Sequence, residues 1–121
     1  MPKLMIRGAF WACALAVLVL ALMPPTPHMP TTGWDKSNHL LAFSTLAVLG
    51  LWSWPGRTVA VLVALLAYGG LIEILQSFTP DRSAEWADLL ADGLGLLVGT
   101  LVVWLLAWLP AGRRPESRIR R

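Results

Sequence analysis

The stretch EILQSFTPDRSAEWADLLADGLGLLVG, residues 73–99, is a polar interruption in a chain that is almost purely apolar on either side of it. Its polar members are Glu73, Gln76, Asp81, Arg82, Glu85, Asp88 and Asp92. Long apolar runs of this kind predict a membrane protein. Ionisable groups are costly at membrane depth, so those in this stretch are candidates for function.

Composition limits the chain to one domain and one environment. The chain has 121 residues, of which 56% are hydrophobic and 14% charged, whereas soluble domains have roughly a quarter charged residues. A soluble domain of this length could not cover so much apolar surface, so we expect the bilayer to be the solvent. The lone cysteine, Cys13, excludes an intramolecular disulfide and a zinc cage of cysteines, and we interpret it as a packing residue.

Four apolar runs cover about residues 8–23, 37–54, 58–78 and 87–109. They predict an all-α membrane protein, a bundle of four transmembrane helices forming a single domain over residues 1–121. Prolines and glycine mark the boundaries: four prolines lie in 24–30, Pro55-Gly56 forms a turn, and Pro80 and Pro110 end helices. A signal peptide is the competing interpretation of the first run, but no small-x-small cleavage site follows it.

The basic residues predict the orientation. Four spans place both termini on one side together with the 55–57 turn. That side holds Lys3, Arg7, Arg57, Arg113, Arg114, Arg118, Arg120 and Arg121 against the single acid Glu116. Basic residues collect on the cytoplasmic side, so we expect both termini, and the basic tail of residues 110–121, to be cytoplasmic. The net charge of +3 is thereby explained without nucleic-acid binding, and the tail can contact anionic lipid.

The remaining polar residues converge near the opposite surface. Asp35 and His39 are one turn apart on a helix face, and Asp88 and Asp92 have the same spacing. Glu73 is followed by Gln76 at i+3. His39, Glu73 and Asp92 lie about 6–9 Å from the outer ends of their helices. Three helices therefore contribute to one polar layer, in which an unpaired carboxylate would cost on the order of 2–3 kcal/mol. The first helix contributes none.

Small residues predict how the helices pack. Gly95 and Gly99 continue the face of the fourth helix, and Gly-x-x-x-Gly lets helices approach closely. Gly69 and Gly70 lie one turn before Glu73. We expect these glycines to dock the third helix on the fourth, which would bring Glu73 near Asp92. Asp81 and Glu85 are expected to be solvated loop residues.

The pattern Asp35-Lys36-x-x-His39, then Glu73-x-x-Gln76, then Arg82, Asp88 and Gly95-x-x-x-Gly99, resembles the VanZ-like family. That family is named for a protein associated with low-level resistance to the glycopeptide teicoplanin. The resemblance implies a small multi-pass helical protein of the bacterial plasma (inner) membrane and the cell envelope. It carries over Asp35, Lys36, His39, Glu73, Gln76, Arg82 and Asp88. One departure is Asp92, where the family usually has Asn.

The first functional hypothesis is a binding protein with an outward-facing pocket. Its residues would be Asp35, Lys36, His39, Glu73, Gln76, Arg82, Asp88 and Asp92. Lys36 and Arg82 could hold a phosphate, and the carboxylates an amine. The expected partners are membrane lipids, with a lipid headgroup, a lipid-linked precursor or a lipoglycopeptide such as teicoplanin as candidate ligands.

Two other hypotheses remain open. His39, Glu73 and Asp88 could be a general acid/base set or a metal site of an intramembrane enzyme that acts on lipid-linked phosphates. No nucleophile motif supports catalysis, since Cys13 lies in another helix, so a non-enzymatic role is favoured and no cofactor is expected. A small proton-coupled exporter is the third hypothesis, although the first helix lacks an ionisable group and Glu73 lies off-centre.

Overall fold

The computed structural model describes residues 2–24, 35–80 and 84–109, and all its regular elements in these ranges are helices. In chain order they are α1 (Lys3–Leu22), α2 (Asp35–Ser53), α3 (Thr58–Ser77) and α4 (Trp86–Ala107). The prediction of an all-α bundle of four helices is confirmed. The proline-rich loop, Asp81 and the basic tail lie outside the described residues.

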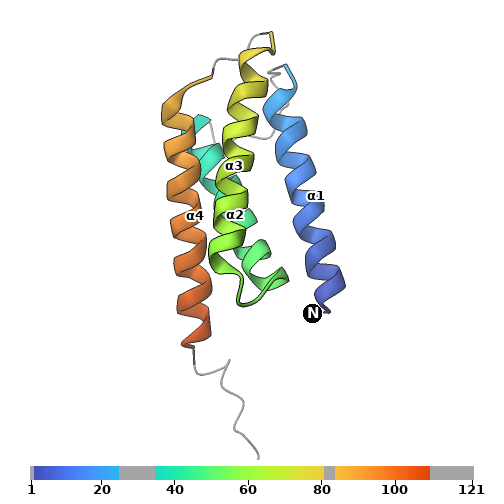
Figure 1. The fold of residues 1–121 in the computed structure, drawn as a ribbon, viewed down its shortest axis with the longest axis vertical. Coiled ribbons are helices and arrows are strands. Elements are labelled where there is room, and N and C mark those ends of the chain that lie inside the picture. The colour runs from blue at the N-terminus through green and yellow to red at the C-terminus, as the bar shows by residue number, and fades with distance from the viewer. Residues whose placement is uncertain (1, 25–34, 81–83, 110–121) are drawn as a thin grey trace, which may run out of the picture.

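The four helices alternate in direction (Figure 1). α1 begins and α4 ends at the same end of the bundle, where the turn between α2 and α3 also lies. The opposite end gathers the end of α1, the start of α2, the end of α3 and the start of α4. The polar turns of three helices are thus brought to one end. The cytoplasmic location of the end where α1 begins and α4 ends stays a prediction.

The turn between α2 and α3 forms where a proline and a glycine follow each other. The Trp54 amide donates to the Gly50 carbonyl at 3.0 Å, and the Arg57 amide donates to the Trp54 carbonyl at 3.2 Å. Gly56 has a φ of 80°, a conformation that residues with a Cβ rarely adopt. The tight turn predicted at Pro55-Gly56 is therefore present.

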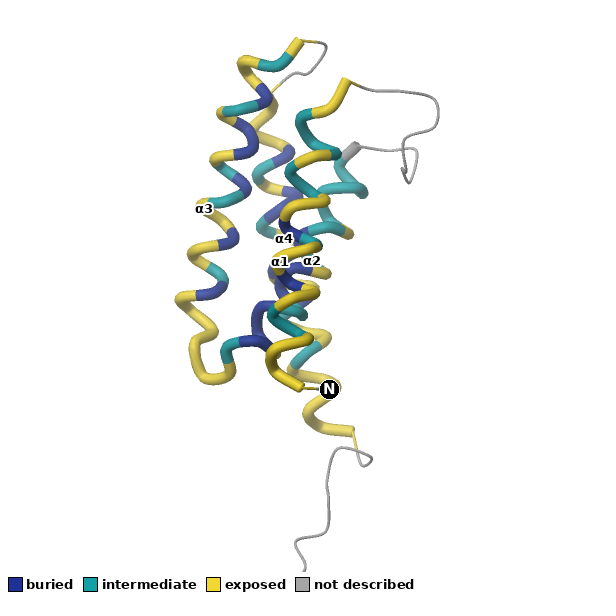
Figure 2. Tube along the Cα trace, turned by 90° about the vertical axis from the view of Figure 1, so that its right-hand side faces the viewer, coloured by how far each residue is buried: buried dark blue, intermediate teal, exposed yellow. Residues whose placement is uncertain are grey.

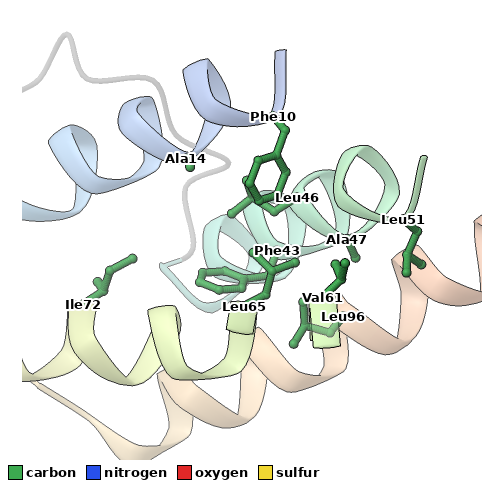
Figure 3. Packing of buried hydrophobic residues seen from close by; sticks show 10 residues of the cluster. All are labelled: Phe10, Ala14, Phe43, Leu46, Ala47, Leu51, Val61, Leu65, Ile72 and Leu96. Atoms are coloured by element: carbon green, nitrogen blue, oxygen red, sulfur yellow. The ribbon is translucent and has the colours of Figure 1, made fainter. Parts of the chain in front are cut away.

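A continuous apolar core runs through the bundle and draws on all four helices (Figure 3). Its buried members are Phe10, Ala14, Phe43, Leu46, Ala47, Leu51, Val61, Leu65, Ile72 and Leu96. Half-buried Cys13 packs against this core, in keeping with a packing role. The helices turn their buried faces inward and leave long exposed faces on the outside (Figure 2).

The exposed faces are themselves apolar. Large exposed side chains include Leu4, Trp11, Leu15, Val59, Val63, Leu66, Ile74, Leu90, Leu97, Leu101, Trp104 and Trp108. Soluble monomers rarely expose apolar surface on this scale. α1, α3 and α4 are each long and apolar enough to cross a membrane. The chain thus has the surface of a membrane protein, with its backbone polar groups satisfied inside helices.

α2 differs from the other three helices. Its first five residues include Asp35, Lys36, Asn38 and His39, and by composition it is not among the helices apolar enough to span. It packs against each of the other helices and most extensively against α4. At the polar start of α2, Lys36 and His39 contact Asp88 and Asp92 of α4.

Side chains and main-chain carbonyls connect α1 to the rest of the bundle. Arg7 donates from Nε to the Ser53 carbonyl at 3.1 Å, and its guanidinium lies 5.3 Å from the centre of the Trp54 ring. Tyr68 donates its hydroxyl to the Ala14 carbonyl at 2.5 Å. These contacts reach from one end of α1 to its middle, so α1 packs on both α2 and α3.

The glycines pack differently from the expectation. A Cβ on Gly95 would lie 2.6 Å from the Leu40 carbonyl oxygen, and one on Gly99 would lie 2.5 Å from that of Ser44. Gly95 and Gly99 therefore seat α4 on α2, and the prediction that they dock on α3 is wrong. A Cβ on Gly70 would meet no atom within 4 Å, so the packing role predicted for Gly70 is wrong too.

Gly95 and Gly99 pack on α2 because the α2 side chain that faces Gly99 is small. Ala47 on α2 is small, and a Cβ on Gly99 would lie only 2.6 Å from the Ala47 Cβ. The backbones of α2 and α4 therefore come close along this seam. Gly69 alone of the α3 pair faces α4, where a Cβ would lie 2.7 Å from Oδ2 of Asp92.

Candidate functional site

Polar side chains gather at the end of the bundle where α2 and α4 begin and α3 ends. We call this group the polar cluster; its described members are Lys36, His39, Glu73, Gln76, Glu85, Asp88 and Asp92. The helices alternate in direction, which is why the first turns of α2 and α4 meet the last turns of α3. Most of the cluster is buried, although it is built from the most polar residues of the chain.

His39 lies between two carboxylates of α4. Its Nδ1 is 2.8 Å from Oδ1 of Asp92, and its Nε2 is 3.8 Å from Oδ2 of Asp88. The exposed fraction is 10% for the His39 side chain, 2% for Asp88 and 0% for Asp92. The i, i+4 spacing places both carboxylates on the helix face that meets α2. The imidazole is thus held from two sides inside the protein.

Lys36 and Glu85 form the rim of the cluster. Lys36 Nζ lies 2.8 Å from Oε2 of Glu85 and 3.4 Å from Oδ1 of Asp88. The Lys36 side chain is 30% exposed and that of Glu85 51%. The hydrogen bond from Lys36 holds the pKa of Glu85 below its ordinary value. The sequence predicts a solvated loop residue at Glu85; the side chain is half exposed, but it pairs with Lys36.

Glu73 connects α3 to the start of α4. Its Oε2 accepts a hydrogen bond from the backbone N–H of Glu85 at 3.0 Å, and Glu85 is the residue that precedes the first turn of α4. Its Oε1 is buried and has no hydrogen-bond partner among the residues that the structure describes. Glu73 therefore has one satisfied and one unsatisfied oxygen. The sequence contains no pattern from which this contact with a loop amide could be predicted.

Gln76, on the last turn of α3, is hydrogen bonded to α1. Its Nε2 donates to the carbonyl of Ala21 at 2.9 Å, while its Oε1 is buried without a hydrogen-bond partner in the described part of the chain. The first helix, which has no ionisable side chain at this end, thus contributes a main-chain acceptor. A main-chain acceptor carries no side-chain signal, so this contribution of α1 cannot be predicted from the sequence.

Two of the expected pocket residues are not placed by the structure. Asp35 is the first residue of α2, but its side chain is not among those described. Arg82 lies outside the described residues. Of the two cations expected to hold a phosphate, only Lys36 is therefore located, and it already contacts two carboxylates.

One group of side chains has the donors of a metal site. His39, Glu73 and Asp92 are buried, and each offers one ligand atom within 4.8 Å of the other two. The sequence suggests His39, Glu73 and Asp88 instead. In the structure Asp88 is within 4.0 Å of both Lys36 and His39, whereas Asp92 completes the group. Asp92, which the sequence-based metal set leaves out, is thus the carboxylate that the fold brings to His39 and Glu73.

Acidic groups outnumber basic ones in the described cluster. Four carboxyl side chains (Glu73, Glu85, Asp88 and Asp92) face one ammonium and one imidazole. Buried carboxylates are stable only when they are paired with cations, hydrogen bonded or protonated. The arrangement is chemically suited to take up positive charge, as an amine, a metal ion or a proton.

The chain matches a known protein family over nearly the whole of this fold. A family model described as VanZ/LLP1 matches residues 6–107, which include the described polar cluster and all or most of each helix. No curated protein and no solved structure gives a significant match.

Proposed function

The chain belongs to the VanZ/LLP1 family, and from this premise we propose that it is a bacterial plasma-membrane protein that binds an amphiphile through its polar cluster. The membrane location is supported by three helices of sufficient length and apolarity. The basic residues that the sequence collects at the other end support placing the cluster at the outer surface.

The proposal rests on the excess of carboxyl groups over cations among the described residues of the cluster. In the part of the chain that the structure describes, Lys36 contacts both Glu85 and Asp88, at 2.8 and 3.4 Å. A headgroup with an amine would add a second cation beside these two carboxylates and make charge-assisted hydrogen bonds with them. Glu85 at the rim is half exposed, whereas Asp88 behind it is nearly fully buried, so an amine would have one solvated and one desolvated carboxylate partner.

Exposed apolar side chains at the same end of the bundle suit the tail of such a ligand. Phe78 follows the last turn of α3 and Trp86 begins α4, and both are more than four-fifths exposed. Leu90 lies one turn further along α4 and is also exposed. An amphiphile whose headgroup contacts the rim would place its tail against these side chains in the lipid.

The candidate ligands are a lipid headgroup, a lipid-linked precursor and a lipid-tailed glycopeptide. The resemblance to the VanZ-like family links the last of these to teicoplanin resistance. We propose the same link for this chain, because a lipid tail would bring the drug to the membrane surface where the cluster lies.

Drug susceptibility of a sensitive bacterium with and without the chain tests this proposal. We expect expression to raise the inhibitory concentration of teicoplanin and not that of vancomycin. Glu85→Gln and Asp88→Asn should reduce the effect. Gly93→Ala is the matched control, because a methyl there meets nothing within 4 Å. Equal effects on both drugs, or none on either, would argue against a lipid-directed mechanism.

A further inference from the structure

We propose that His39, Glu73 and Asp92 form a binding site for a divalent transition-metal ion such as Zn²⁺ or Mn²⁺. The three side chains come from α2, α3 and α4, and their ligand atoms lie within 4.8 Å of one another. The site lies deeper than the rim formed by Lys36 and Glu85, and all three of its residues are buried.

The donor set selects the class of ion. One imidazole nitrogen and two carboxylate oxygens form a mixed set of ligands. Such a set suits Zn²⁺, Mn²⁺ or Fe²⁺, whereas Mg²⁺ and Ca²⁺ prefer sites made of oxygen ligands alone. The only cysteine, Cys13, is on α1 and outside the set, so the set contains no thiolate. Three protein ligands leave a coordination position for water or a ligand atom, as in catalytic zinc sites.

Glu73 gives an independent reason to expect a cation here. Its side chain is nine-tenths buried, and only Oε2 has a hydrogen bond, at 3.0 Å from the backbone nitrogen of Glu85. Oε1 has no hydrogen-bond partner in the described residues. A buried carboxylate oxygen without a partner is costly. A metal ion between Glu73 and the other two ligands would satisfy it.

The surroundings of His39 match those of a metal-bound histidine. Nδ1 faces Asp92 at 2.8 Å, and Nε2 faces the carboxylate of Asp88 at 3.8 Å. A histidine that binds a metal through one nitrogen commonly directs its other N–H at a carboxylate, which fixes the tautomer and the ring. The proton between His39 and Asp92 would leave when the ion binds, so affinity should fall in acid.

The backbone of α3 also leaves room for the site. Gly69 lies one turn before Glu73, and a Cβ there would come 2.7 Å from Oδ2 of Asp92 and 3.3 Å from the Phe43 ring. Glycine at this position therefore allows the Asp92 carboxylate to lie against α3 beside Glu73. The inference concerns the same cluster as the proposed amphiphile binding, but either can fail without the other, because metal content is measured without any amphiphile.

Metal content of the full-length protein tests the inference. The protein is purified in detergent, stripped with a chelator, equilibrated separately with Zn²⁺ and Mn²⁺, desalted and analysed by elemental mass spectrometry. We expect about one ion per chain for at least one metal, and at least tenfold weaker binding after Glu73→Gln or His39→Ala. Gly93→Ala, whose methyl meets nothing within 4 Å, and Cys13→Ala should bind as the unsubstituted protein does.

X-ray absorption of the loaded, unsubstituted protein keeps the test decisive if the variants do not fold. It should show one imidazole with oxygen neighbours and no sulfur. Failure of both ions to bind, equal binding by a folded Glu73→Gln variant, a sulfur ligand, or a shell of water alone would overturn the inference.

Discussion

Nδ1 of His39 lies 2.8 Å from Oδ1 of Asp92, and this contact joins α2 to α4 inside the bundle. Further along the same pair of helices, Gly95 and Gly99 let the α4 backbone approach the carbonyls of Leu40 and Ser44. The seam between α2 and α4 is therefore polar at one end and closely packed in its middle. The candidate site and the tightest packing belong to the same two helices.

Replacing Asp92 by a neutral amide should change stability little. Asn has the shape of Asp and can still hydrogen bond to His39, whereas Asp92→Leu would leave the buried imidazole without this partner. We expect Asp92→Leu to lower the free energy of unfolding by about 1–3 kcal/mol more than Asp92→Asn. Unfolding in detergent, followed by circular dichroism, measures the difference. An equal loss in both variants would show that the contact with His39 is not what stabilises this position.

A methyl group in the middle of the seam should separate α2 from α4. A Cβ at Gly99 would lie 2.5 Å from the Ser44 carbonyl oxygen and 2.6 Å from Cβ of Ala47, neither of which can move without the backbone. We expect Gly99→Ala to destabilise the bundle by about 1–3 kcal/mol. Gly93→Ala is the control, since its methyl meets nothing and alanine favours the helix by up to about 1 kcal/mol. Similar unfolding midpoints for the two variants would contradict the observed seam.

Of two adjacent glycines of α3, only one should perturb the site when it is replaced by alanine. A Cβ on Gly69 would lie 2.7 Å from Oδ2 of Asp92, while one on Gly70 would meet nothing within 4 Å. Gly69→Ala should therefore displace the Asp92 carboxylate and change the environment of the His39 ring. Nuclear magnetic resonance of the labelled imidazole measures this, with Gly70→Ala as the unperturbed comparison. The geometry would be refuted by identical His39 resonances in the two variants.

The pair at the rim should weaken in acid. Lys36 lowers the pKa of Glu85 in the folded protein, whereas the unfolded carboxyl titrates near its ordinary value of about 4.3. Folding therefore gains from the ionised carboxylate above that value, and the gain is lost as the pH falls through the lowered pKa. The difference in unfolding midpoint between the unsubstituted protein and Glu85→Gln should be present at neutral pH, begin to fall near the unfolded pKa and be lost once the pH is below the lowered pKa of Glu85.

High salt should reduce the same difference, because the pair is partly exposed and screened. A difference that stays constant from neutral pH down to about pH 3 would mean that Glu85 acts through something other than its charge.

The helices and their polar end could be predicted from sequence because both follow from local patterns. Apolar runs bounded by prolines and the Pro55-Gly56 turn define four helices. Once the helices alternate in direction, residues at i, i+3 and i+4 such as Glu73, Gln76, Asp88 and Asp92 must meet at one end. These inferences require no knowledge of which helix lies beside which.

The partners of individual residues depend on three-dimensional packing that the sequence leaves open. The small residues of α4 could have met Gly69 and Gly70 of α3 or Ser44 and Ala47 of α2, and only the fold decides for α2. The hydrogen bond from the Glu85 amide to Glu73 depends on how the chain passes from α3 to α4. For the same reason Asp92, rather than Asp88, joins His39 and Glu73.

Mass spectrometry of the molecules that co-purify with the protein tests most directly whether the polar cluster binds an amphiphile. The protein, Asp88→Asn and Gly93→Ala are purified from the same membranes and their bound lipids compared with the bulk lipid. We predict that an amine-bearing amphiphile is enriched with the unsubstituted protein and with Gly93→Ala, and is lost with Asp88→Asn. Bound lipids that match the bulk membrane, or that are the same with and without the Asp88 carboxylate, would contradict the proposed function.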